Sequence, residues 1–197
     1  MVKFSLIILI LLTLTSCLRL DDNLFNPNST KITQYKLDNY TGETDFTLDA
    51  SYLIPDSLIH IFQLLSQAPD ESAATLISAI YIGNIDSIVS DTVIMYCHGN
   101  AEHMDFYWPR AKLLANIKSK NNFGVLMIDY RGYGLSEGEP TENGLYADVD
   151  AALKWLKAKG LADSRLIMYG FSMGSAPATK LSIGNYSMKP CKLLLEA

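Results

Sequence analysis

Four short apolar runs in the second half of the chain constrain its fold most strongly. They are VIMYC at 93–97, VLMI at 125–128, LIMY at 166–169 and LLL at 193–195. Strands of a parallel sheet are buried on both faces, so they read as continuous apolar runs separated by helices. The sequence therefore predicts an α/β fold, with a mostly parallel sheet of βαβαβ type.

The intervals between these runs carry helical patterns. The segment before Gly160 places five apolar side chains on one helix face: Leu145, Val149, Ala152, Leu153 and Leu156. Asp150 and Lys154 form an i,i+4 pair on its polar side, and Gly160 is a typical helix stop. An earlier helix is predicted over residues 107–118. Both helices fit crossovers between parallel strands.

The first half of the predicted domain has a different pattern. Segments 45–49, 57–65 and 76–85 are short and partly alternate between apolar and polar residues. Alternation over a few residues is typical of strands with one solvent-exposed face. We therefore expect antiparallel N-terminal strands on the parallel sheet, within a single domain spanning residues 41–197.

The N-terminus has the pattern of an export signal. Its apolar stretch, residues 4–12, is shorter than the roughly 20 residues that a membrane-spanning helix needs. Leu14-Thr15-Ser16-Cys17 resembles the bacterial lipoprotein signal, so we expect cleavage of residues 1–16 and lipidation of Cys17. A plain signal peptide with an incidental cysteine is the alternative. Residues 17–40 would be a tether, and the protein would be anchored to a membrane of the bacterial cell envelope.

The charge of the chain limits the classes of binding partner that we expect, and two of its cysteines are expected to be buried. The chain has 16 basic and 21 acidic residues, a formal net charge of −5, and no basic cluster. Nucleic acid is therefore not an expected partner. Cys97 and Cys191 lie in or beside apolar runs and are predicted to be two buried thiols. The sequence does not indicate an oligomeric state.

The pentapeptide GFSMG, residues 170–174, directly follows one of the predicted strands. A serine on a tight strand-to-helix turn presents its hydroxyl clear of the sheet, and the flanking positions must be small. Gly170 and Gly174 satisfy that demand, so Ser172 is the candidate nucleophile. The alternative is an ordinary glycine-flanked turn with a solvated serine.

A serine that attacks a carbonyl needs N–H donors for the oxyanion that forms. Met173, at the start of the following helix, would supply one donor. Asn100, in the loop after the run at 93–97, would supply the other, and Gly99 would let that loop turn inward. We interpret His98 as a structural residue of this loop rather than a general base.

A dinucleotide-binding reading of Gly132 and Gly134 fails, because the third glycine of that fingerprint is replaced by Glu137. We therefore expect no cofactor, and no metal site is predicted.

Three segments resemble the α/β-hydrolase superfamily in order and spacing: YCHGNAEH, IDYRGYGLSEGEPTENGLYADVDAALKWL and LIMYGFSMG. They look most like its bacterial lysophospholipase-like and serine-aminopeptidase-like members, over residues 90–197. The resemblance implies Ser172 as nucleophile and Asn100 and Met173 as the oxyanion hole. It places residues 129–136 in a loop beside the active site, which we interpret as scaffolding rather than as a source of catalysis by Asp129 or Arg131.

In this superfamily an acid and then a histidine follow the nucleophile. The segment after Ser172 contains no His and no Asp, and its single acid is Glu196. One hypothesis is the N-terminal portion of a longer serine hydrolase, truncated after about strand 6 and catalytically incomplete. Such an enzyme would cleave esters, thioesters or peptide bonds of small acyl-containing or peptide substrates. The alternative is a natural short form that acts as a non-catalytic binding or scaffold protein.

Overall fold

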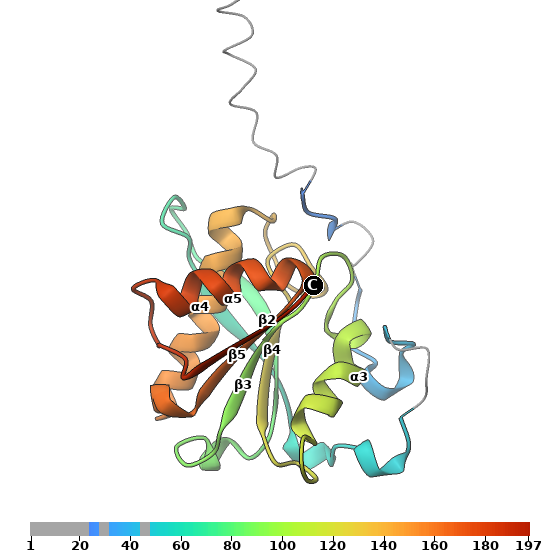
Figure 1. Cartoon of the computed structure of the whole chain (residues 1–197). Helices are drawn as coiled ribbons and strands as arrows, with labels where there is room; N and C mark the ends of the chain where they lie inside the picture. Colours follow the sequence, from blue (N-terminus) through green and yellow to red (C-terminus); the bar gives the residue numbers. More distant parts are fainter. Residues whose placement is uncertain (1–23, 28–31, 44–47) are drawn as a thin grey trace, which may run out of the picture.

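A six-stranded sheet forms the centre of the computed structural model, which describes residues 24–27, 32–43 and 48–197 (Figure 1). Within these residues the strand order is β1-β2-β4-β3-β5-β6. The strands are β1 (Ile59–Ser66), β2 (Thr75–Ile82), β3 (Val93–Cys97), β4 (Gly124–Ile128), β5 (Leu166–Phe171) and β6 (Lys192–Glu196). Strands β3, β4, β5 and β6 are parallel to one another. Strand β2 pairs antiparallel with β4, and β1 pairs antiparallel with β2. This confirms the predicted fold class.

Three α-helices cover the sheet, with α3 (Met104–Ala115) on one face and α4 (Glu142–Ala158) and α5 (Ser175–Ile183) on the other (Figure 1). The Thr141 side chain caps α4 by accepting a hydrogen bond from the backbone N–H of Gly144 (3.0 Å). The predicted Asp150–Lys154 pair forms on this helix, with 3.0 Å between the charged atoms. Within residues 32–43 and 48–197, six short 3₁₀ helices are also present: Leu37–Asn39, Ala50–Tyr52, Asp56–Leu58, Ile85–Ser87, Asp163–Arg165 and Ser172–Gly174.

The helix predicted over residues 107–118 begins and ends earlier than expected. It begins at Met104 and ends at Ala115, where Asn116 becomes its C-cap. The Asn116 side chain donates to the carbonyl of Lys112 (2.8 Å), and Lys118 has a left-handed backbone with φ 70°. Apolar spacing alone does not reveal that a polar side chain ends the helix there.

Alternation along β3 divides the core into two layers. Val93, Met95 and Cys97 pack with α4 and α5, whereas Ile94 and Tyr96 pack with α3. Successive side chains of a strand point to opposite faces, so a strand that is covered on both faces needs apolar residues at every position. This explains the continuous apolar runs of β3 and β4, which are buried at every position.

The prediction of two buried thiols is wrong for one of them. Cys97 is buried in β3, but Cys191 is exposed, and both are free thiols. Cys191 directly precedes β6, one of the two edge strands of the described sheet, where Leu194 and Leu195 are 47% and 54% exposed. An apolar neighbourhood in sequence does not guarantee burial at a sheet edge.

Several predictions concern residues outside the described part of the chain. They are the signal peptide at 1–16, the lipidated Cys17, and most of the strand predicted at 45–49. In the described ranges 24–27, 32–43 and 48–197, none of the helices is sufficiently long and apolar to cross a bilayer.

Candidate active site

The serine turn lies at the carboxyl end of β5. One 3₁₀ turn, Ser172–Gly174, links this strand directly to α5. Ser172 has φ +50°, a left-handed conformation that is uncommon for residues other than glycine. It is exposed, and no side chain among the described residues hydrogen-bonds its hydroxyl. The turn therefore leaves Ser172 exposed at the carboxyl end of β5.

Close packing explains the two flanking glycines. A Cβ on Gly174 would collide with the backbone carbonyl of Cys97, at the end of the neighbouring strand β3. A Cβ on Gly170 would lie 2.7 Å from the carbonyl oxygen of Gly174. Cys97 and Gly170 are paired in register, so the turn sits against the carboxyl end of β3. This places Met173 beside the loop that follows β3.

That loop, residues 98–103, connects β3 to α3 and contains Asn100. A Cβ on Gly99 would lie 3.2 Å from the ring of Phe171, so the loop begins beside the serine turn. Ala101 and Glu102 have left-handed backbones with φ 57° and 64°. The structure thus brings Ser172, Met173 and the Asn100 loop to one edge of the sheet, where ligands of open α/β sheets commonly bind.

Hydrogen bonds from tyrosine hydroxyls hold this loop. Tyr130 donates to the carbonyl of His98 (3.0 Å), and Tyr107 lies within reach of the carbonyls of Asn100 (3.2 Å) and Ala101 (3.3 Å). Burial raises the pKa of Tyr107 and Tyr130 well above 10, so both hydroxyls stay protonated and can donate.

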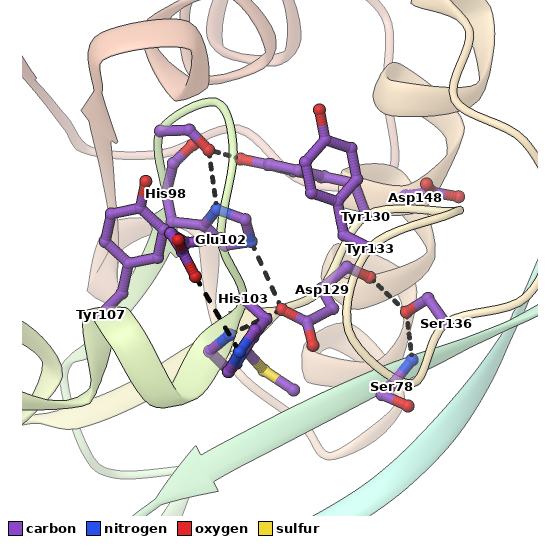
Figure 2. Close-up of polar contacts among 12 residues, drawn as sticks. Ser78, His98, Glu102, His103, Tyr107, Asp129, Tyr130, Tyr133, Ser136 and Asp148 are labelled. Carbon is purple, nitrogen blue, oxygen red and sulfur yellow. Dashed lines mark hydrogen bonds and ion pairs between the residues drawn. The ribbon is translucent and has the colours of Figure 1, made fainter. Parts of the chain in front are cut away.

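The side chain of His98, the first residue of this loop, is fully buried. Figure 2 shows its imidazole between the rings of Tyr107 and Tyr130, whose centroids lie 4.7 and 4.5 Å away. Its Nδ1 lies 2.9 Å from the carbonyl oxygen of Gly99, and its Nε2 lies 3.6 Å from Oδ1 of Asp129. These contacts fit the structural role that we expect for His98.

The loop after β4 helps to hold the segments around the Asn100 loop through hydrogen bonds. The carboxylate of Asp129 accepts from the backbone N–H of Met104 (2.7 Å) and from the hydroxyl of Tyr35 (2.6 Å). Ser136 donates to the carbonyl of Asp129 (2.6 Å) and accepts from the backbone N–H of Ser78 (2.9 Å), as Figure 2 shows. Asp129 is therefore engaged in joining three segments.

Arg131 belongs to a separate buried ion pair. Its guanidinium contacts Asp148 (2.9 Å) and Glu71, and the side chain is 1% exposed. Burial raises the pKa of Asp148, and the Arg131 charge opposes that rise. A buried charge that is paired with other protein side chains fits a structural role. This agrees with the interpretation of residues 129–136 as scaffolding.

Glu196 reaches the correct sheet edge, but its carboxylate is occupied. It accepts from Arg110 Nη1 (2.6 Å) and from the Tyr169 hydroxyl, and these bonds lower the pKa of Glu196, the Tyr169 bond contributing most. The Arg110 guanidinium also pairs with Glu43 and lies 4.1 Å from the Phe171 ring centroid. Arg110 thus contacts Phe171, the residue before Ser172, and helps to hold it in place.

Sequence reasoning missed the residues that support the site: Tyr35, Tyr107, Arg110, Tyr130 and Tyr133. Tyr130 and Tyr133 lie inside the quoted DYRGYG segment, but no spacing rule marks a tyrosine hydroxyl as a loop anchor. In the described ranges, no group of three or more His, Cys, Asp or Glu side chains is placed to hold a metal ion.

Comparisons with known proteins match mainly the second half of the chain. The model of the family "Serine aminopeptidase, S33" matches residues 89–196, more than half of the chain. Alpha/beta hydrolase domain-containing protein 17C of mouse is 34% identical over 90 residues, covering 45% of this chain and 27% of the relative. The uncharacterized protein YfhR of Escherichia coli K12 is 37% identical over 84 residues, covering 42% of this chain and 28% of the relative.

Solved structures share the fold. A putative hydrolase from Agrobacterium vitis S4 aligns with a TM-score of 0.54 at 20% identity, covering 70% of this chain and 51% of that chain. An esterase from Exiguobacterium antarcticum aligns with a TM-score of 0.50 at 24% identity, covering 68% and 44%. The chain thus spans about a quarter of the length of the curated relatives named above.

Proposed function

We propose, from the premise that this chain belongs to the S33 serine aminopeptidase family of α/β-hydrolases, that Ser172 is the nucleophile of an acyl-transfer hydrolase. The observation that carries the proposal is the exposed residue Ser172 on a left-handed backbone beside the Asn100 loop. A residue held in a sparsely populated conformation needs support from its surroundings, and such residues cluster at active sites.

In this mechanism the Ser172 hydroxyl attacks the carbonyl carbon of an ester, thioester or peptide bond. The carbonyl oxygen becomes an oxyanion, which accepts hydrogen bonds from the backbone N–H groups of Met173 and Asn100. Met173 is suited to this because the first N–H groups of a helix have no intrahelical partner. The leaving group departs, an acyl-enzyme forms, and water then releases the acyl group and restores the serine.

A general base must take the proton of Ser172. No hydrogen bond joins Ser172 to any of the three histidines of this sequence, all of which the structure describes. His98 and His103 are buried, and His60 lies on β1 near the carbonyl of Gly83. We propose that the base and its orienting acid come from outside these 197 residues, in keeping with the greater length of the relatives.

A fluorophosphonate probe tests the nucleophile directly, because it phosphonylates only an activated serine. We expect one covalent adduct, mapped by mass spectrometry to Ser172, in the protein at the full length that its gene encodes. Ser172→Ala should abolish it. Ser182→Ala is the matched control, since the Ser182 hydroxyl bonds to the carbonyl of Ala178 within α5, and it should label normally.

A second candidate is a non-catalytic protein that binds acyl or peptidyl ligands at the same edge of the sheet, where Ser172, Met173 and the Asn100 loop lie together. A folded full-length protein that the probe leaves unlabelled would support this candidate and contradict the first.

We also propose that a lipid on Cys17 anchors the protein to the cell envelope. The carbonyl of Leu24 accepts a hydrogen bond from Asn100 (2.7 Å). Seven residues span at most roughly 25 Å, so an anchored Cys17 would keep the Asn100 loop near the bilayer surface. Substrates would then be small acyl-containing or peptide molecules at that surface. Cys17→Ser should move the protein from the membrane to the soluble fraction, and retention in the membrane would contradict the anchor.

A further inference from the structure

The side chain of Asn100 is held from four directions. Its Nδ2 donates to the carbonyl of Leu24 (2.7 Å). Its Oδ1 accepts from the hydroxyl of Tyr133 (2.7 Å) and from the backbone N–H groups of Ala101 (2.9 Å) and Asn26 (3.4 Å). An exposed asparagine rarely needs so many partners, and two of them come from a segment more than 70 residues away.

That segment, Leu24–Asn26, is itself fastened to the domain, and we call it the N-terminal strap. Phe25 is 9% exposed and belongs to the apolar core that also contains Tyr133. Met173, the other proposed oxyanion donor, packs against the same core. The backbone N–H of Asn26 also donates to the Tyr133 hydroxyl (3.2 Å). Figure 1 shows the blue strap beside the loop that leads from β3 into α3.

Tyr133 is the bridge between the strap and the loop. Its side chain is fully buried, and burial raises the pKa of Tyr133 to about 12, so its hydroxyl is protonated at neutral pH and donates to Asn100. The same hydroxyl accepts from Asn26. One buried oxygen therefore sets the position of both the asparagine side chain and the strap.

The backbone of the Asn100 loop needs such support. Ala101 and Glu102 adopt left-handed conformations in succession, which are unfavourable for residues with a Cβ. Without the contacts to Asn100, the loop would relax toward other conformations. In the proposed mechanism the backbone N–H of Asn100 must face the oxyanion, and an oxyanion donor works only when it is already in place.

We propose that Tyr133 and the N-terminal strap are positioning elements that hold the backbone N–H of Asn100 in its oxyanion-binding orientation. This rests on the function proposed above. Neither element touches the substrate. Both act through the side chain of Asn100, so the strap that leads from the predicted lipid anchor also completes the active site.

The first test is Tyr133→Phe in the protein at the full length that its gene encodes, with fluorophosphonate labelling measured over a range of probe concentrations. We expect the maximal labelling rate to fall about tenfold and the half-saturating probe concentration to change little. Loss of an entire oxyanion donor costs 100-fold or more, and here the donor is misplaced rather than removed. Tyr81→Phe is the matched control, because Tyr81 is equally buried and its hydroxyl has no partner among the described residues. It should label at the wild-type rate.

A second variant and a second measurement keep the inference testable if Tyr133→Phe fails to fold. Phe25→Ala removes the apolar anchor of the strap without altering Tyr133. We expect the same fall in maximal labelling rate and faster hydrogen–deuterium exchange in residues 98–103, with exchange in β5 unchanged.

The outcomes separate the two proposals. If the wild-type protein labels at Ser172 and the variants label and exchange like it, the positioning role is wrong and the proposed nucleophile stands. If the wild-type protein never labels, the proposed function is wrong. Hydrogen exchange in residues 98–103 then still decides whether Tyr133 and the strap hold the loop.

Discussion

The two parts of the site, the serine turn and the Asn100 loop, are held in place by different kinds of interaction. The serine turn is set by backbone packing within βαβ units, because Gly170 and Gly174 let α5 approach the end of β3. The Asn100 loop depends on side chains, with Tyr107, Tyr130 and Tyr133 as donors. A strained backbone can therefore be stabilised by close packing in one place and by distant hydrogen bonds in another.

The contacts that hold the Asn100 loop also join residues that lie far apart in the sequence. The Asn100–Leu24 bond joins residues 76 positions apart, and the Asn26–Tyr133 bond joins residues 107 apart. We therefore expect changes in the N-terminal segment to disturb the loop and to leave the serine turn intact. Three variants challenge or refine this expectation.

The largest effect should come from Gly174→Ala. The added Cβ would collide with the backbone carbonyls of Cys97 and His98, which cannot move unless β3 shifts. We expect the free energy of unfolding to fall by about 3 kcal/mol, measured by chemical denaturation.

Gly160→Ala is the matched control for this substitution. Gly160 has φ +87°, but the nearest atom to its added Cβ would be a Val89 methyl at 3.4 Å. Only backbone strain remains, so we expect a loss of about 1 kcal/mol. Equal losses at the two glycines would show that close packing does not hold the serine turn.

A smaller effect is expected from Asp105→Ala, which releases the N-terminal segment after the strap. The buried carboxylate of Asp105 accepts from the backbone N–H groups of Lys36 and Leu37, both at 2.7 Å. We expect a loss of about 2 kcal/mol of unfolding free energy, because two charge-assisted hydrogen bonds disappear. Limited proteolysis should show faster cleavage within residues 32–43.

Glu142→Ala controls for the loss of an acid from the first turn of a helix. Glu142 begins α4, and its carboxylate accepts from Tyr146 in the same helix (2.7 Å). This variant should lose less stability and leave the cleavage of residues 32–43 unchanged. Faster cleavage in both variants would show that general destabilisation, rather than the Asp105 contact, exposes the segment.

The smallest effect concerns the acid at the serine turn. Bonds from Tyr169 and Arg110 lower the pKa of Glu196 in the folded state. The resulting stability is present above the unfolded glutamate pKa of about 4.3 and is lost as the pH falls through the lower folded value. Glu196 is 47% exposed, so the effect is small.

Glu196→Gln should therefore flatten the decline of stability below about pH 4.3, measured as melting temperature against pH. Glu139→Gln, at an exposed position, serves as the matched charge-removal control and should keep the wild-type slope. If Glu196→Gln keeps that slope too, the Arg110 network does not contribute to the stability of the turn.

Much of the fold could be predicted because its signals are local. Each of the four apolar runs became a parallel strand, and the face that contains Leu145 and Val149 packs into the core. Burial at the sheet edge was not predictable in the same way. Cys191 lies beside an apolar run in the sequence, yet it is exposed. Burial depends on which segments pack against a residue, and the sequence pattern does not show them.

By itself, the sequence determined the strands of the parallel core, the serine turn and the small residues that the turn requires. Those features depend on periodicity and on glycine, which act over a few residues. Only the tertiary structure decided what holds Asn100, because Leu24, Asn26 and Tyr133 are brought to it by chain folding. A hydrogen bond between residues 76 positions apart leaves no periodic trace in a sequence, since its geometry exists only after the sheet has formed.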